Sequence, residues 1–224
     1  MPPRAVIFDF NGTVSDDEPL LFRVFGEVLA EHGIELDEET YFAELAGFSD
    51  PEIAETVLRG AGREPTPELL ETILRAKIDG YCEAVRSESP IGADAADFVR
   101  AVASRVPVAI ASGAFREEIE LVLDLAGLRD PFGAAIVCID DVDQGKPDPG
   151  GYLLALARLN EDRGLHESIV ARDVLAIEDS PAGVQAAKAA GLRCAVVAGD
   201  ERAEAAADFV IERLDAESAA KLLS

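Results

Sequence analysis

Five short apolar runs, separated by stretches with helical spacing, most constrain how this chain of 224 residues folds. Strands that are buried on both faces of a sheet read as continuous apolar runs. Their alternation with helices is typical of a parallel sheet covered by helices on both sides. We therefore predict the α/β fold class with a doubly wound parallel sheet. The expected strands are Ala5–Asp9, Val106–Ala111, Ala134–Ile139, Val174–Ile177 and Cys194–Ala198.

The stretches between these runs carry the signals of amphipathic helices. Over residues 115–127, apolar residues recur on one face and the pattern stops at a glycine, a common helix C-terminus. Another helix is expected to begin with Ser180 as its N-cap and Pro181 as its first residue. The apolar run Phe209–Ile211 and the alanine-rich C-terminus are expected to add an edge strand and a helix.

Residues 16–88 break this rhythm, because they contain successive amphipathic patterns with no strand between them. Glycines such as Gly47, and the Gly60–Pro67 segment, separate the expected helices. We therefore expect two domains: an α/β core formed by residues 1–15 and 89–224, and a small α-helical domain formed by residues 16–88. The helical domain is expected above the carboxyl end of the first strand.

The charge balance restricts the partners of the protein. Lys and Arg total 20 against 44 Asp and Glu, a formal net charge of −24, which disfavours nucleic acid and anionic membranes as partners. No apolar run approaches the roughly 20 residues of a membrane span, and we expect no secretion leader. Cys82, Cys138 and Cys194 form no C-x-x-C pair and are expected to be buried thiols of a reducing compartment. We expect a cytoplasmic protein.

Polar residues that suit metal and phosphate binding follow four of the predicted strands. In chain order they are Asp9, Ser112, Gly113, Lys146, Glu178 and Asp179. Each alone also fits a turn or a helix cap. Because the carboxyl ends of parallel strands meet at the edge where ligands bind, we expect them to form one site. Carboxylate oxygens suit Mg²⁺, and a lysine neutralises phosphate as a point charge.

These residues match the motifs of a known superfamily. Asp9–Thr13 reads D-F-N-G-T against the pattern D-x-D-G-T, and Ser112 matches the Thr/Ser motif. Lys146–Pro147 matches the K-P motif, and Glu178–Asp179 matches the acidic motif. Over nearly its whole length the sequence resembles the haloacid dehalogenase (HAD) superfamily, in the phosphatase and phosphoglucomutase branch with an inserted helical cap. The resemblance implies a Rossmann-like core with that cap.

The resemblance also implies a role for the acidic motifs. Asp9 would be the nucleophile that forms an aspartyl-phosphate, which splits one difficult displacement into two easier ones. Mg²⁺ would be held by Asp9, the backbone carbonyl of Asn11, Asp179 and, directly or through water, Glu178.

The remaining motifs would bind the substrate phosphate. The resemblance assigns this role to Ser112, Gly113 and Lys146, which would stabilise charge on the transferring phosphoryl group.

One position departs from the family pattern. In the family, an acid two residues after the nucleophile protonates the leaving oxygen and then deprotonates the attacking water, but this chain has Asn11 there. An amide does not exchange protons near neutral pH, so turnover is expected to fall by about 10²–10⁴-fold. Asp16, Asp17 and Glu18 follow closely and are candidates to replace the acid in part. We expect Asp17 to be a solvated hinge charge.

These features predict a Mg²⁺-dependent phosphatase of a small phosphorylated metabolite, phosphoglycolate- or sugar-phosphate-like, that is slowed by Asn11. The alternative is a catalytically weak module of the same fold that binds phosphate or a phosphometabolite. Relatives that form a Schiff base need a cap lysine, and none lies near the Gly47–Asp50 turn. A scaffold without any site would leave four polar motifs unexplained. The expected specificity loop of the cap is Gly47, Phe48 and Ser49.

Overall fold

A parallel sheet forms the centre of the molecule. The computed structural model describes residues 2–87, 89–162 and 168–224. Its six strands follow the order β3-β2-β1-β4-β5-β6, and every neighbouring pair is parallel, the order found in Rossmann folds. The predicted α/β class with a doubly wound parallel sheet is confirmed. The strands are β1 (Ala5–Phe8), β2 (Val108–Ala111), β3 (Ile136–Val137), β4 (Val174–Glu178), β5 (Arg193–Val197) and β6 (Phe209–Ile211).

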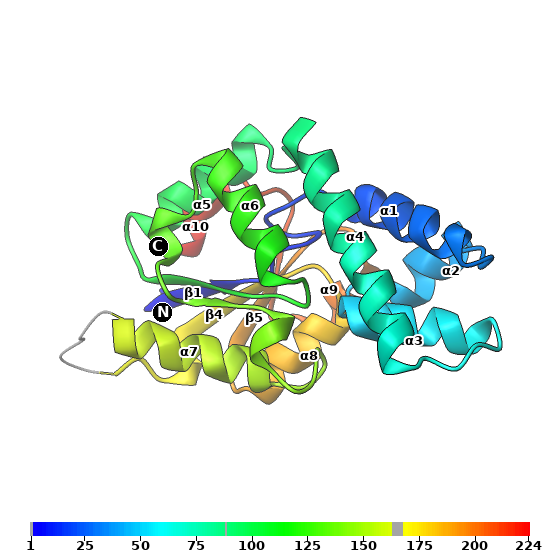
Figure 1. The fold of residues 1–224 in the computed structure, drawn as a ribbon. Coiled ribbons are helices and arrows are strands. Elements are labelled where there is room, and N and C mark those ends of the chain that lie inside the picture. The colour runs from blue at the N-terminus through cyan, green and yellow to red at the C-terminus, as the bar shows by residue number, and fades with distance from the viewer. Residues whose placement is uncertain (1, 88, 163–167) are drawn as a thin grey trace.

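Helices cover both faces of this sheet (Figure 1). One face carries α5 (Ala93–Ala103), α6 (Arg116–Ala126) and α10 (Ala216–Leu222). The other carries α7 (Gly150–Asp162), α8 (Pro181–Ala189) and α9 (Glu201–Ala206). Strand β1 shows why both faces must be covered: Val6 and Phe8 pack into one apolar cluster, and Ala5 and Ile7 into the other. Alternating side chains of one strand thus enter two separate cores.

Three strands are shorter than the sequence pattern predicts, and β1 loses only its last residue, Asp9. Strand β2 begins at Val108 rather than Val106, because Pro107 has no backbone N–H to donate, although its carbonyl accepts from Val6 at 3.0 Å. Strand β3 ends at Val137, because the N–H of Cys138 is turned to the Asp141 carboxylate at 2.9 Å. The strand positions were therefore predicted well and their ends less well.

A helical insert lies between β1 and α5, at the edge of the sheet (Figure 1). Within the described part of residues 16–88 it contains helices and no strand. One of its helices, α2, passes directly into a π-helical turn, η1. The elements of the insert are α1 (Glu18–Glu31), α2 (Glu38–Thr40), η1 (Tyr41–Leu45), α3 (Asp50–Gly60) and α4 (Pro67–Ser87).

Apolar packing continues from the insert into the sheet. Buried side chains of the insert, such as Leu21, Phe25 and Tyr81, belong to the same cluster as Phe8 of β1 and Phe98 of α5. The insert therefore packs on the rest of the molecule through a shared core rather than through a polar surface.

A buried ion-pair group also joins the insert to the sheet layer. Lys77 of α4 is fully buried, and its Nζ donates to Asp50 of α3 at 2.6 Å and to Glu118 of α6 at 2.9 Å. Burial acts to lower the pKa of Lys77, but the two carboxylates outweigh it and hold the pKa above its usual value. One ammonium group thus connects two helices of the insert with a helix of the core.

We expect Lys77→Ala to lower the free energy of unfolding by about 3–5 kcal/mol, because it leaves two carboxylates buried without their cation. Denaturant unfolding monitored by circular dichroism measures this change. Arg75→Ala is the matched control, since Arg75 lies on the same helix and also reaches α6, through Glu117 at 2.8 Å, but both side chains are about half exposed. The control should have a much smaller effect. Equal losses in the two variants would contradict the importance of the buried group.

Candidate active site

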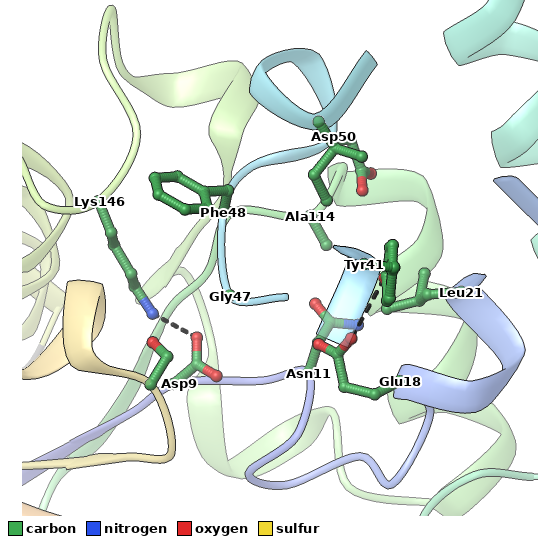
Figure 2. A pocket seen from close by; sticks show the side chains of 13 residues that line it. Asp9, Asn11, Glu18, Leu21, Tyr41, Gly47, Phe48, Asp50, Ala114 and Lys146 are labelled. Carbon is green, nitrogen blue, oxygen red and sulfur yellow. Dashed lines mark hydrogen bonds and ion pairs between the residues drawn. The ribbon is translucent and has the colours of Figure 1, made fainter. Parts of the chain in front are cut away.

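The predicted site residues meet at the carboxyl edge of the sheet. Asp9 follows β1 directly, Lys146 lies in the loop after β3, and Glu178 is the last residue of β4. Lys146 donates to Asp9 and, at 2.6 Å, to Glu178. Figure 2 shows Lys146 and Asp9 pointing toward each other. Three loops that are far apart in sequence therefore place their charged groups in direct contact.

Glu178 is held by two donors at once. It is fully buried and accepts from Lys146 and from the hydroxyl group of Tyr152 on α7. Burial, together with the charge of Glu178, raises the pKa of Tyr152, so this hydroxyl remains a donor. No sequence motif marks Tyr152, which occupies an apolar position of an amphipathic helix. A buried tyrosine nevertheless needs a partner for its hydroxyl group.

Three carboxylates are close enough to share a metal ion. Ligand oxygens of Asp9, Glu178 and Asp179 lie within 4.8 Å of one another. Burial raises the pKa of Asp9 to about 7, with Lys146 acting against it. Burial and the charges of the other two acids raise the pKa of Asp179. A divalent cation would relieve this repulsion, and an all-oxygen donor set suits Mg²⁺.

The turn after the nucleophile position must contain glycine. Gly12 has a φ of +74°, and a Cβ atom there would lie 2.0 Å from Oδ2 of Asp179. The backbone of residues 11 and 12 therefore lies directly against the Asp179 carboxylate. This proximity is compatible with the predicted use of the Asn11 carbonyl as a metal ligand.

The predicted phosphate-binding residues have different surroundings. Gly113 and Lys146 line a small cavity between the insert and this edge of the sheet. The hydroxyl group of Ser112 accepts from the Ala114 N–H at 3.1 Å and donates to Oδ1 of Asn11 at 3.3 Å. Gly113 and Lys146 thus line the cavity, whereas Ser112 bonds to its own turn and to the Asn11 amide.

The expectation for Asp17 is wrong. Its side chain is 1% exposed rather than solvated, and its Oδ2 accepts from Nδ2 of Asn11 at 2.9 Å and from the hydroxyl group of Tyr81. Burial raises the pKa of Asp17 above its usual value. The apolar run that follows residue 18 buries this acid because α1 packs on α4. The amide of Asn11 is therefore oriented by one acceptor and one donor.

The other two acids after the motif differ in position. Asp16 is exposed, whereas Glu18 lines the cavity and accepts from the hydroxyl group of Tyr41 at 3.2 Å. Figure 2 shows Glu18 and Tyr41 on the side of Asn11 that is remote from Lys146. Burial, and then the charge of Asp17, raises the pKa of Glu18 to about 7. Of these three acids, only Glu18 lines the cavity.

The predicted cap loop reaches the same edge. Gly47 and Phe48 line the cavity, and Ser49 caps α3. A Cβ atom on Gly47, whose φ is +87°, would lie 2.6 Å from Cβ of Ser180 at the start of α8. One on Gly113 would lie 3.1 Å from Cα of Ser49. The loop is therefore packed between two turns of the core, and its role in specificity stays a prediction.

Fold and site together define an α/β enzyme with a helical insert over an acidic site at the carboxyl edge of its sheet. A family profile described as haloacid dehalogenase-like hydrolase matches residues 3–191. The chain belongs to this family, as the motifs predicted. Among the described residues, no helix is both long and apolar enough to cross a membrane.

Several relatives that are similar in sequence are phosphatases. A phosphorylated carbohydrates phosphatase of Thermotoga maritima is 31% identical over 84% of this chain and 82% of its own length. The fructose-1-phosphate phosphatase of Escherichia coli is 31% identical over 84% of this chain and 93% of its own length. The crystal structure of CbbY from Rhodobacter sphaeroides with phosphate superposes with a TM-score of 0.79, at 29% identity and 96% coverage of both chains. The chain is a hydrolase of the phosphatase type.

We expect Asp17→Asn to stabilise the protein. Both hydrogen bonds to Asp17 end on the same oxygen, so an amide carbonyl there keeps them while the buried charge disappears. Because burial raises its pKa, the folded chain binds this proton more tightly than the unfolded chain. The parent therefore loses stability as pH rises from about 4. Urea unfolding at pH 8 should favour the variant by about 1 kcal/mol or more, with a smaller difference at pH 4.

The exposed neighbour provides the control for this measurement. Asp16→Asn should leave the pH dependence of the free energy of unfolding as it is in the parent. A parent and an Asp17→Asn variant with identical pH dependence would contradict the burial of a charge at this position.

Proposed function

We propose that the protein is a Mg²⁺-dependent phosphatase of a small phosphorylated metabolite, of the sugar-phosphate or phosphoglycolate kind. The observation that carries this proposal is the contact of Lys146 with Asp9 and Glu178 beside Asp179, under the helical insert. The phosphatases among its relatives support it. Three free, buried cysteines fit a cytoplasmic location, which we propose as well.

The proposed reaction has two displacements. A carboxylate oxygen of Asp9 attacks phosphorus, the ester oxygen leaves with its electron pair, and an aspartyl-phosphate forms. Water then attacks the same phosphorus and restores the carboxylate. Lys146 and the Gly113 amide would bind the phosphoryl oxygens, and Lys146 would keep Asp9 ionised against its burial. Ser112 would hold the turn that presents this amide.

The acidic group would hold the metal. Asp9, Asp179, the Asn11 carbonyl and, directly or through water, Glu178 are the proposed ligands. When bound, Mg²⁺ supplies positive charge next to the transferring phosphoryl group and offsets the repulsion between the acids.

We further propose that residues 16–88 act as a cap on a core formed by residues 1–15 and 89–224. The cavity between the insert and the sheet edge has a volume of about 30 Å³, which suits one or two water molecules rather than a metabolite. A substrate therefore enters only when the insert moves away from the sheet edge. The loop of Gly47, Phe48 and Ser49 would then close over it.

A catalytically weak phosphate-binding module is the second candidate function. Only the amide at Asn11 favours it, because every other group that the chemistry needs is present. Turnover of a phosphate monoester separates the two candidates.

Metal binding should raise the melting temperature. With Mg²⁺ about 100-fold above its Kd, we expect a rise of about 5 °C or more. Asp179→Ala should abolish the rise, whereas Asp143→Ala, an exposed acid in the loop before Lys146, should preserve it. For each variant, the readout is the difference between the melting temperatures in Mg²⁺ and in EDTA. This comparison is needed because removing an acid from this crowded group can itself change the melting temperature. A metal-independent parent that is active in EDTA would overturn the site assignment.

Exchanging the side chains of Asn11 and Asp17 should accelerate turnover. Asn11→Asp alone would place two carboxylates where an amide now donates to Asp17, and one of them would take up a proton. The double variant Asn11→Asp/Asp17→Asn keeps the hydrogen bond and returns the acid to the family position. We expect its turnover of alkyl phosphates to rise by about 10²-fold or more. Steady-state phosphate release measures this effect.

The parent should show the matching defects. It should prefer aryl phosphates, whose leaving groups need little protonation, and it should accumulate phosphorylated Asp9, detectable after acid quenching. Asp17→Asn alone is the control and should gain no activity. If the parent cleaves alkyl phosphates rapidly and the double variant gains nothing, the acid is another group, and Glu18 becomes the first candidate.

A further inference from the structure

The charges around the cavity are distributed unevenly. On the sheet side, Asp9 and Lys146 line it. On the insert side, the charged lining residues are Glu18 and Asp50. Among the described residues that line the cavity, Lys146 is the only cation, and it is already bonded to two carboxylates. The insert therefore presents acids and no base to the part of a substrate that lies away from the transferred phosphate.

Lys77 compensates part of the charge of Asp50 but offers no donor to the cavity. It is fully buried, donates to Asp50 and Glu118, and lies over the rings of Phe25 and Tyr81, 5.4 and 5.3 Å from their centroids. It does not line the cavity. Its donors are engaged inside the protein and unavailable to a ligand.

The N-terminus of α3, beside the cavity, is neutralised as well. A helix N-terminus attracts anions through its free N–H groups. Here the N–H of Ser49 donates to Glu52 at 3.0 Å, and Asp50 is the first helical residue. Glu52 thus takes the N–H of Ser49, and Asp50 adds a further negative charge to the first turn of the helix.

Apart from Tyr41, whose hydroxyl group already donates to Glu18, the groups that remain on the insert side are hydrogen-bond acceptors and apolar surfaces. Glu18 accepts hydrogen bonds whether or not it is ionised, and its pKa is raised to about 7, first by burial and then by neighbouring acids. Leu21, Phe48 and Ile53 supply the apolar part of the lining. Such a surface suits hydroxyl groups on a carbon chain, and a second phosphate or a carboxylate would meet like charge without a partner.

We propose that the substrate is a phosphate monoester whose leaving group carries no anionic substituent and directs its hydroxyl groups to Glu18 and Asp50. This inference rests on the proposed phosphatase function. It places polyol and sugar monophosphates inside the substrate range, and bisphosphates and phosphorylated carboxylic acids, phosphoglycolate included, outside it.

Matched substrates test the inference on the unmodified enzyme with Mg²⁺ at pH 8. Fructose 1-phosphate is compared with fructose 1,6-bisphosphate, and glycerol 3-phosphate with phosphoglycolate. We expect kcat/KM to favour the substrate without the second anion by about tenfold or more in each pair. Calorimetric binding of the two fructose phosphates gives a second readout that does not depend on turnover.

A substitution tests whether Glu18 causes the discrimination. Glu18→Gln should reduce the monophosphate-to-bisphosphate ratio of kcat/KM by about threefold or more, because the opposing charge is lost. Glu31→Gln, an exposed acid at the end of the same helix, is the matched control and should leave the ratio unchanged. An equal loss for both substrates would assign Glu18 an acid–base or structural role and overturn its role in charge selection.

The outcomes separate the inference from the proposed function. Hydrolysis of p-nitrophenyl phosphate, combined with equal use and equal binding of the two fructose phosphates, would overturn the substrate class alone. Absence of hydrolysis and of binding for every phosphate ester tested would overturn the proposed function and the inference together.

Discussion

One lysine among three carboxylates organises the carboxyl edge of the sheet. Lys146 bonds to Asp9 and Glu178, and Asp179 completes the acidic group. Burial raises the pKa of Asp9 and of Asp179, and repulsion from the neighbouring acids raises both further. A single ammonium group does not balance three carboxylates, so we propose that the site requires a further cation. The sheet topology creates this requirement, because it ends strands β1 and β4 side by side.

The amide at Asn11 has a physical explanation in its neighbour. Asp17 is buried without a cation in contact, and it needs donors rather than another acid beside it. A carboxylate at residue 11 would meet Asp17 directly. In this chain the amide stands at residue 11 and the buried acid at residue 17 of the same loop. One hydrogen bond therefore links the amide at residue 11 to the burial of Asp17.

The sequence predicted the chemistry of the sheet edge better than that of the insert. Strand ends such as Asp9 and Glu178 follow from apolar runs that stop at an acid, and the parallel topology brings them together. The burial of Asp17 and the contacts of Tyr81 and Tyr152 depend on how helices pack, and a single sequence holds no signal for that. The ion pair of Lys77 could not be predicted for the same reason, because its partner Glu118 lies 41 residues away in the sequence, on helix α6.

Composition and substrate class are linked through the supply of cations. The chain has 20 Lys and Arg residues for 44 acids, and its two buried lysines are each held by two carboxylates of the protein. The positive charge of these two lysines is thus already paired with acids of the protein. In the proposed function the sheet edge would still attract phosphate, because its acids would bind a metal ion. Among the described residues of the insert, none that lines the cavity is a cation. By our inference, the negative charge on this side of the cavity, rather than its shape alone, therefore decides which leaving groups the enzyme accepts.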